Sequence, residues 1–279
     1  MKKAILVVSF GTTHKDTLKL TIEKIEDRIK RTFPEYEMRR AFTAHMIIKI
    51  LKDRDGIVTD TPEEALEKLK LEGFEEVIVQ PLHIIPGAEF DYIKLVVDEY
   101  KRKGVFKKIS LGRPALYFQA VEEELPDDYK IFVEAIDEVI PKDKAAVFMG
   151  HGSSHPANAC YGCLQSVLSD LDKEKIYIGT VEGYPTIETI IRRLKKDNVK
   201  EVVLVPLMLV AGDHAKNDMA SDEEDSWKSI LEVEGINSEV YLHGLGEIEK
   251  FQDIYLKHIK DVIEGKYINF GETRKGRRY

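Results

Sequence analysis

The chain has 279 residues, of which 43% are apolar, and its 42 basic and 50 acidic side chains give a formal net charge of −8. That apolar content and mixture of charges exclude a disordered chain, and the acidic balance argues against a general nucleic-acid binder, which presents a basic surface. The two cysteines cannot form the disulfide framework of a small secreted domain.

The amino-terminal segment is predicted to be a strand of the fold and not a targeting signal. Its apolar run, residues 4–8, is short, and acidic residues follow from Asp16 onward, whereas a signal peptide needs a longer apolar stretch and a small-residue cleavage site. No segment approaches the roughly 20 apolar residues of a membrane span. We therefore expect a cytoplasmic protein with neither a membrane nor a nucleic acid as its partner.

The first half of the chain alternates short apolar runs with amphipathic helical patterns, which predicts a parallel sheet with helices on both faces. Strands are expected at residues 4–9, 36–42, 76–80 and 108–111. One helix follows the first strand, on a stripe formed by Leu18, Ile22, Ile25 and Ile29. Another begins at Thr61-Pro62 with capping-box spacing, and a later one begins near Pro126.

The pattern of strands and turns then restarts, which indicates an internal repeat. Residues 3–14 resemble residues 144–155, because both begin with lysine, continue as an apolar strand and end in a glycine, two small hydroxyl side chains and a histidine. Residues 76–82 likewise resemble residues 201–207, since both end in Pro-Leu. Each of these later segments follows a helix that we expect a proline to start, at Pro185 in the second copy.

The repeat predicts two similar Rossmann-like α/β halves with parallel sheets, residues 1–142 and residues 143–265, followed by a basic tail at residues 266–279. In open α/β sheets, ligands bind beyond the carboxyl ends of the strands. The turns that follow the strands are therefore where a functional site is expected.

Three ionisable residues follow apolar strands of the second half. His151 comes directly after the strand at residues 145–149 and lies between two glycines, which let the backbone turn sharply and expose the ring. Glu182 follows the next strand, and His214 lies in the loop after the strand that ends in Pro-Leu. Two imidazoles and one carboxylate suit a first-row divalent metal and leave coordination positions open for a substrate. Taken singly, Glu182 also fits a helix-capping carboxylate, and His214 fits a surface-loop histidine.

The repeat places Phe10 opposite His151 and Glu89 opposite His214, so the first half carries equivalent loop ends. The turns after the first strand of each half are rich in small hydroxyl side chains, which fit either ordinary helix caps or the binding of an anionic ligand group. The candidate substrate-binding residues are Ser9, Phe10, Gly11, Thr12, Thr13, Gly152, Ser153 and Ser154. Neither turn has the spacing of a dinucleotide or phosphate-binding loop, so no nucleotide is expected.

Both cysteines lie in a CxxC motif, Cys160 and Cys163, within a predicted helix. At this spacing the two thiols share one helix face, which favours core packing; a redox pair and a metal-ligand pair are the alternatives. An iron–sulfur cluster would need about four cysteines and is not expected.

Two charged segments are expected on the surface. Residues 218–225 contain five acidic side chains and fit a solvated helix start. Residues 273–279 contain four basic side chains and fit a loose tail.

Several segments together resemble the anaerobic cobalt chelatase family, the sirohydrochlorin cobaltochelatases of the class II chelatases. They are residues 9–12, 41–43, 149–152 and, above all, the long stretch 206–228. That long stretch is highly specific, and the resemblance extends from residue 1 to about residue 265. It implies a tetrapyrrole held in a cleft between two similar α/β halves.

The resemblance also implies the reaction and its residues. The family acts in anaerobic cobalamin biosynthesis, on sirohydrochlorin or on precorrin-2. His151 and His214 match the two active-site histidines of the family, Glu182 matches the glutamate that completes the metal site, and Glu89 matches a second acidic position. Co²⁺ is then a bound substrate ion.

Metal insertion releases two pyrrole protons, and a neutral imidazole can accept a proton near neutral pH. Our hypothesis is that His151 and His214 deliver the ion while Glu89, across the cleft, relays protons. The substrate carries many carboxylates, so the amides and hydroxyls of the two turns are expected to offset its charge, with Arg113 as a further candidate.

Three rival functions remain open from the sequence. The same chemistry could use Fe²⁺ or Ni²⁺, because geometry and supply set metal selectivity more than ligand type does. A non-catalytic tetrapyrrole or metal carrier would bind without releasing a product. A CxxC thiol oxidoreductase would require a cysteine with a lowered pKa. A homo-oligomer also remains open.

Overall fold

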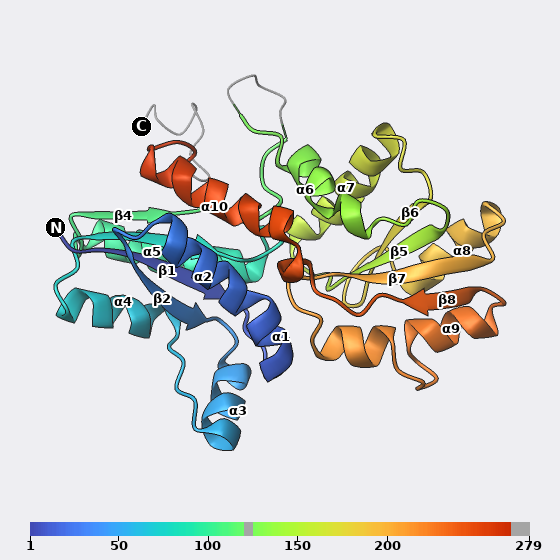
Figure 1. Ribbon diagram of the computed structural model, residues 1–279, viewed down its shortest axis with the longest axis horizontal. Helices are drawn as coiled ribbons and strands as arrows, with labels where there is room; N and C mark the ends of the chain where they lie inside the picture. Colours follow the sequence, from blue (N-terminus) through green and yellow to red (C-terminus); the bar gives the residue numbers. More distant parts are fainter. Residues whose placement is uncertain (120–124, 269–279) are drawn as a thin grey trace.

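Two four-stranded parallel sheets organise the computed structural model, which describes residues 1–119 and 125–268 (Figure 1). The first sheet has the strand order β2-β1-β3-β4, with β1 at Lys3–Ser9, β2 at Glu37–Phe42, β3 at Glu76–Pro81 and β4 at Lys108–Leu111. The second has the order β6-β5-β7-β8, with β5 at Ala145–Gly150, β6 at Ile176–Thr180, β7 at Glu201–Leu207 and β8 at Asn237–Val240. The expected α/β class with two similar parallel sheets is therefore confirmed.

The two sheets repeat each other in register as well as in strand order. Val8 pairs with Pro81 between β1 and β3, and Met149 pairs with Pro206 between β5 and β7. These are the same positions that the sequence repeat makes equivalent. The turns that follow β1 and β5 therefore occupy matching places at the carboxyl edges of their sheets.

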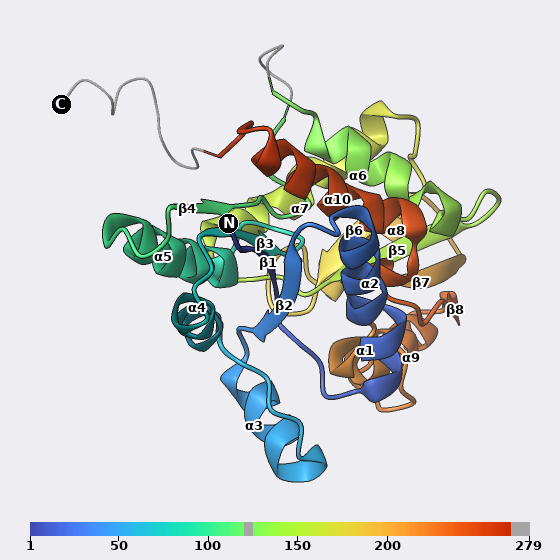
Figure 2. The ribbon, with the colours of Figure 1, turned by 60° about the vertical axis from the view of Figure 1, so that its left-hand side comes forward.

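Helices cover both faces of each sheet, as parallel strands require. The helices before residue 120 are α1 (Lys15–Leu20), α2 (Ile22–Thr32), α3 (His45–Asp55), α4 (Pro62–Leu71) and α5 (Ala88–Arg102). The later ones are α6 (Asp128–Ile136), α7 (Ala159–Asp170), α8 (Ile187–Lys196), α9 (Trp227–Val233) and α10 (Glu249–Ile263). Short helical turns are η1 (Asp137–Val139), η2 (Pro156–Asn158), η3 (Ala215–Met219) and η4 (Leu245–Glu247). Helix α3 projects from the edge of the first sheet (Figure 1, Figure 2).

The helix expected after β1 is divided into two. Thr21 has a non-helical backbone and separates α1 from α2, and its hydroxyl donates to the carbonyl of Thr17 at 2.5 Å. A threonine hydroxyl competes in this way with regular helical bonding. The apolar stripe nevertheless stays buried across the break, since Leu18, Ile22 and Ile25 all lie in the core.

The two prolines expected to start helices behave differently. Pro62 occupies the first turn of α4 behind a complete capping box formed by Thr61 and Glu64. Pro185, in contrast, precedes the helix cap of α8, and its carbonyl accepts a hydrogen bond from the backbone N–H of Thr180. The expectation that Pro185 starts a helix is therefore wrong.

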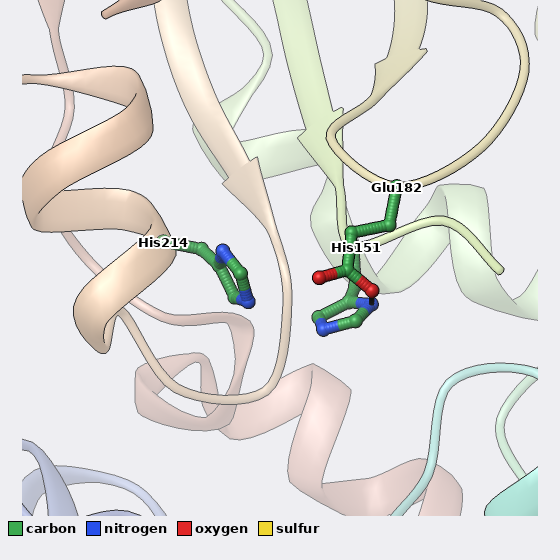
Figure 3. Close-up of side chains that lie close together, drawn as sticks. All are labelled: His151, Glu182 and His214. Carbon is green, nitrogen blue, oxygen red and sulfur yellow. Dashed lines mark ion pairs between the residues drawn. The ribbon is translucent and has the colours of Figure 1, made fainter.

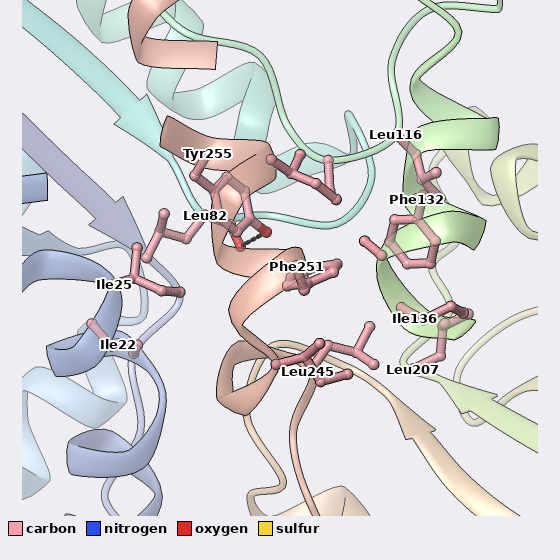
Figure 4. Close-up of a cluster of buried hydrophobic side chains, with 14 of the residues drawn as sticks. Ile22, Ile25, Leu82, Leu116, Phe132, Ile136, Leu207, Leu245, Phe251 and Tyr255 are labelled. Carbon is pink, nitrogen blue, oxygen red and sulfur yellow. Dashed lines mark hydrogen bonds between the residues drawn. The ribbon is translucent and has the colours of Figure 1, made fainter. Parts of the chain in front are cut away.

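The largest apolar cluster joins the two sheets (Figure 4). Helix α10, at the end of the described chain, contacts α2 and β3 of the first sheet and also α6, while α6 contacts α7 beside the second sheet. Phe251 and Tyr255 of α10 lie at the centre of this cluster, beside Phe132 of α6. Two smaller clusters lie under α4 and α5 on one side and under α8 and α9 on the other.

The carboxyl-terminal part of the predicted basic tail, residues 269–279, lies outside the described residues. Within the described ranges, no helix combines the length and the apolar content that are needed to cross a bilayer. The division of the chain near residue 142 stays a prediction.

Candidate active site

The structure brings His151, Glu182 and His214 together at the carboxyl edge of the second sheet (Figure 3). They follow β5, β6 and β7, which are neighbours in that sheet. Each can offer one ligand atom, and these atoms lie within 4.8 Å of one another. The three residues therefore form a group that can hold one metal ion.

The turns after β5 and β6 are held against each other by their backbones. Gly152 has a φ of +82°, and a Cβ atom at this position would lie only 2.6 Å from the backbone nitrogen of Gly183. The backbone N–H of Glu182 donates to the carbonyl of His151 at 2.7 Å. Glycine is needed at position 152 because the turn has a left-handed backbone and a close neighbour.

The ring of His151 is oriented by its own turn. Its Nδ1 lies 2.9 Å from the carbonyl oxygen of Gly152. A carbonyl oxygen only accepts, so this contact assigns the hydrogen to Nδ1 and leaves the lone pair on Nε2. The ring thus offers Nε2 as its metal-binding atom.

His214 is oriented in the same way by a carboxylate. Its Nδ1 lies 2.7 Å from Oδ2 of Asp218, four residues later in η3. The hydrogen on Nδ1 donates to this carboxylate, so Nε2 again carries the lone pair. Sequence reasoning missed Asp218 because it treated the acidic run as a solvated surface; the four-residue spacing between the two side chains was the available signal.

The group is open to a ligand of the protein. The side chains of His151, Glu182 and His214 are 42%, 57% and 34% exposed. The two rings lie edge to face with their centroids 4.6 Å apart, and Oε2 of Glu182 lies 3.8 Å from Nδ1 of His151. Two neutral nitrogens and one carboxylate neutralise only part of a divalent charge and leave coordination positions free.

The equivalent positions of the first half carry different chemistry. Glu89 lies in the first turn of α5, after β3, and is not part of the three-residue group. Phe10 follows β1 and is 46% exposed. The first half therefore presents an acid and an aromatic ring where the second half presents two imidazoles.

Two hydroxyl side chains, those of Thr12 and Ser153, bond to backbone N–H groups of their own turns. Oγ1 of Thr12 accepts the backbone N–H of His14 at 3.2 Å, and Oγ of Ser153 accepts that of His155 at 3.0 Å. The Ser9 hydroxyl is buried, and the described part of the chain offers it no hydrogen-bond partner.

The other candidate residues of the turns are placed as follows. Gly11 has a φ of +94° and lies against the ring of Phe42. The carbonyl of Thr13 accepts from Arg54, and Ser154 is exposed.

Arg113 is not available to a substrate. It is 1% exposed, and its guanidinium donates to Asp128 at 2.9 Å and to Asp261 at 2.8 Å. A buried arginine saturated by two carboxylates holds the fold and cannot offset the charge of a ligand. The expectation of a substrate contact for Arg113 is therefore wrong.

The cysteines of the CxxC motif pack against the largest apolar cluster from α7. Burial raises the pKa of the Cys160 thiol and that of the Cys163 thiol. A redox-active cysteine requires the opposite shift. The packing interpretation of this motif is therefore favoured.

The sequence matches the family model described as cobalt chelatase (CbiK) over residues 3–264. The chain belongs to the cobalt chelatase (CbiK) family. Among curated members, the sirohydrochlorin cobaltochelatase of Salmonella typhimurium is 40% identical over 266 residues, which are 94% of this chain and 97% of that protein. The sirohydrochlorin cobaltochelatase CbiKC of Nitratidesulfovibrio vulgaris is 34% identical over 262 residues, 94% of this chain and 91% of that one. The resemblance found in the sequence is thereby confirmed.

Two solved structures share the fold at low sequence identity. CbiX, described as the terminal enzyme of siroheme biosynthesis in denitrifying bacteria, gives a TM-score of 0.53 at 16% identity and covers 92% of this chain and 98% of its own. A multi-domain protein of Deinococcus radiodurans with structural similarity to chelatases gives a TM-score of 0.55 at 13% identity over 92% of this chain. The match spans 55% of that longer protein. Both confirm the chelatase-like architecture.

Proposed function

We propose that the protein inserts Co²⁺ into sirohydrochlorin and releases two pyrrole protons, the reaction named for its curated relatives. The observation that carries this proposal is the group formed by His151, Glu182 and His214, at the ends of three neighbouring strands in a cobalt chelatase family member. Such a group offers ligands to a divalent ion and leaves positions for the nitrogens of a macrocycle.

In the proposed mechanism, Co²⁺ binds to Nε2 of His151, Nε2 of His214 and the carboxylate of Glu182. The hydrogen bonds to Gly152 and Asp218 hold both rings in the tautomer that binds metal. Neutral imidazoles bind the ion less strongly than thiolates would, so the ion can pass to the macrocycle. As pyrrole nitrogens replace these ligands, the charge of the ion is neutralised by the deprotonated tetrapyrrole.

The displaced protons need a separate acceptor. A nitrogen that holds the ion cannot take up a proton at the same time, so we assign the relay to Glu89 of the first half. A carboxylate can take up a proton and pass it on to water. A Glu89→Gln variant whose turnover matches wild type at every pH would overturn this assignment.

We place the tetrapyrrole against the two turns that follow β1 and β5. The exposed ring of Phe10 offers an apolar surface to the flat face of the macrocycle, beside Ser9, Gly11, Thr12 and Thr13. In the second turn, Gly152, Ser153 and Ser154 offer amides and hydroxyls to its carboxylates. The cytoplasmic location and a homo-oligomer stay predictions.

The test is anaerobic metal insertion, followed by the absorption change of sirohydrochlorin with Co²⁺, Fe²⁺ and Ni²⁺. Wild type is compared with His151→Ala and with His243→Ala, which changes an exposed histidine paired with Glu247. We expect a Co²⁺ rate that collapses in His151→Ala and persists in His243→Ala. Binding of the tetrapyrrole with no rate above the uncatalysed reaction would indicate a carrier, and a faster rate with Fe²⁺ or Ni²⁺ would reassign the metal.

A further inference from the structure

Two histidine–carboxylate contacts bridge the two halves of the molecule. Nε2 of His14, after β1, lies 2.8 Å from Oδ1 of Asp213, after β7. Nε2 of His155, after β5, lies 3.1 Å from Oδ2 of Asp91, in α5 after β3. Each contact therefore joins the turn after the first strand of one half to the segment after the third strand of the other half.

The internal repeat makes these bridges equivalent. His14 and His155 occupy the same position in the repeated segments, and each has its backbone N–H bonded to a hydroxyl two residues earlier, Thr12 or Ser153. The strands β3 and β7 that precede the two carboxylates also correspond. The same device is thus built twice, once in each direction across the molecule.

The second nitrogen of each ring fixes the direction of each bridge. Nδ1 of His155 accepts the backbone N–H of Ala157 at 3.1 Å, and Nδ1 of His14 lies 3.3 Å from Nζ of Lys216. Because both partners are donors, both rings carry their hydrogen on Nε2 and donate it to the carboxylate opposite. Neither bridge requires a protonated imidazole.

The bridges hold the segments that carry the reacting groups. Asp213 directly precedes His214. Asp91 lies two residues after Glu89, and both are in the first turn of α5. The halves are also joined by the apolar cluster around α6 and α10. The polar bridges therefore complete the connection at the edge where the candidate site lies.

We propose that the bridges His14–Asp213 and His155–Asp91 are a matched pair of positioning contacts, which set the separation of the two halves and hence the placement of His214 relative to Glu89 around the tetrapyrrole. This inference rests on the proposed function, since it assigns the bridges a role in the same reaction. The four residues position reacting groups and do not themselves touch the ion.

The pair is expected to act cooperatively. The carboxylates of Asp91 and Asp213 are 55% and 70% exposed, and such exposed contacts are individually weak. If both bridges oppose the same displacement, as the proposal requires, the remaining bridge still limits the movement of the halves when the other is lost. Removal of both should cost more than the product of the single losses.

Insertion kinetics test this cooperativity. His14→Ala and His155→Ala should each lower kcat/KM for Co²⁺ insertion about two- to five-fold, and the double variant should lose more than the product of the two. His155→Gln should recover activity, because its amide can accept from Ala157 and donate to Asp91. His243→Ala, which breaks a histidine–carboxylate contact within one half, is the matched control and should keep the wild-type rate. Losses that simply multiply would overturn the proposal.

A distance measurement separates this proposal from the proposed function. Spin labels at Leu71→Cys and Val233→Cys, exposed positions of opposite halves, report the separation in a Cys160→Ser, Cys163→Ser background. The His14→Ala, His155→Ala double variant should broaden the distance distribution. An unchanged distance distribution refutes the proposal that the bridges set the separation, even if the wild-type protein inserts Co²⁺ normally. A broadened distribution supports the bridges as contacts that set the separation of the halves. This holds even if the wild-type protein proves to be a carrier, in which case only the role of the bridges in Co²⁺ insertion is withdrawn.

Discussion

Asp218 shapes the metal-binding properties of His214 without belonging to the three-residue group. Its carboxylate accepts the hydrogen of Nδ1 at 2.7 Å, which fixes the ring and leaves Nε2 as the donor atom. A carboxylate behind an imidazole also makes that imidazole a stronger ligand. The sequence alone does not single out Asp218, because residues 218–225 contain five acidic side chains. Only the helical turn η3 places one of them, Asp218, beside His214.

Asp218→Ala should therefore weaken Co²⁺ binding by about 10- to 100-fold, the usual effect of losing such a partner. The measurement is a Co²⁺ titration followed by visible absorption. Asp222→Ala is the matched control, because Asp222 belongs to the same acidic run, is 91% exposed and pairs with Lys228. Equal affinities in the two variants would show that Asp218 does not support the site.

His83 is a second residue whose importance only the structure reveals. Both of its ring nitrogens are buried with no hydrogen-bond partner in the described chain, and burial lowers the pKa of its imidazole to about 4. The unfolded chain takes up a proton near its ordinary pKa of about 6.5, while the folded protein does not. The contribution of His83 to the free energy of unfolding is therefore fully present above pH 6.5, and it is lost as the pH falls from about 6.5 towards 4.

Between pH 7 and pH 5 this difference should cost about 2 kcal/mol of unfolding free energy. Burial also lowers the pKa of His258, which adds to the loss in the same direction. His83→Phe should remove the part of this loss that comes from His83. The free energies of unfolding at pH 7 and pH 5, measured by urea titration, should then differ less than they do in wild type. An identical pH dependence in both proteins would contradict the assignment.

At the scale of elements, the paired turns after β5 and β6 determine where Glu182 lies. Gly152 permits the close approach, and the bond from Glu182 to the carbonyl of His151 fixes it. The sequence predicted that both residues follow strands, because short apolar runs mark strands reliably. It could not predict the contact between the turns, since the neighbouring order of β5 and β6 comes from tertiary packing.

Gly152→Ala should destabilise the protein by about 1–3 kcal/mol, because alanine meets both the strained backbone and the nitrogen of Gly183. It should also abolish most Co²⁺ insertion by displacing Glu182. Gly104→Ala is the control: its φ is +59° but nothing lies within 4 Å of the added Cβ, so stability should fall by about 1 kcal/mol with no loss of turnover in the folded protein. Thermal unfolding and insertion rates check both variants.

Other elements show the limit of sequence patterns. Strands with continuous apolar runs, such as β1, β3, β5 and β7, were predicted close to their observed bounds. Strand β8 and helix α3 were not predicted: β8 is four residues long and partly polar, and α3 buries Leu51 alone among its residues. Both lack the periodic pattern on which such predictions depend.

At the scale of the whole molecule, a buried charged network joins segments that are far apart in sequence. Arg113, after β4, donates to Asp128 of α6 and to Asp261 of α10. Burial disfavours the charge on Asp128, but hydrogen bonds from His258 and Arg113 hold the pKa of Asp128 below its usual value. Loss of one member of this network therefore leaves a buried charge without its partner.

Arg113→Met should cost about 3–5 kcal/mol, because it leaves buried carboxylates without a partner. Urea unfolding measures the loss. The triple variant Arg113→Met, Asp128→Asn, Asp261→Asn should recover much of it, since it removes the charges that lack compensation. A triple variant less stable than Arg113→Met alone would show that the carboxylates contribute independently of the arginine.

The sequence repeat predicted the two sheets and their matching turns, and the same repeat contained His14 and His155. Their partners could not be predicted, because His14 and Asp213 are separated by 199 positions and nothing local marks the pairing. For His151, Glu182 and His214, by contrast, each residue follows a recognisable strand, so shared topology was enough to group them.

The position of α10 has a consequence for the order in which the protein is made. A ribosome completes Glu249–Ile263 after the eight strands that the structure describes, yet this helix covers β3 and contacts α2 of the half that emerged first. Until then, the apolar surface that Phe251 and Tyr255 later cover has no permanent neighbour. The core of the first half therefore closes only after α10 has been synthesised, and nascent chains that lack α10 are candidates for chaperone protection.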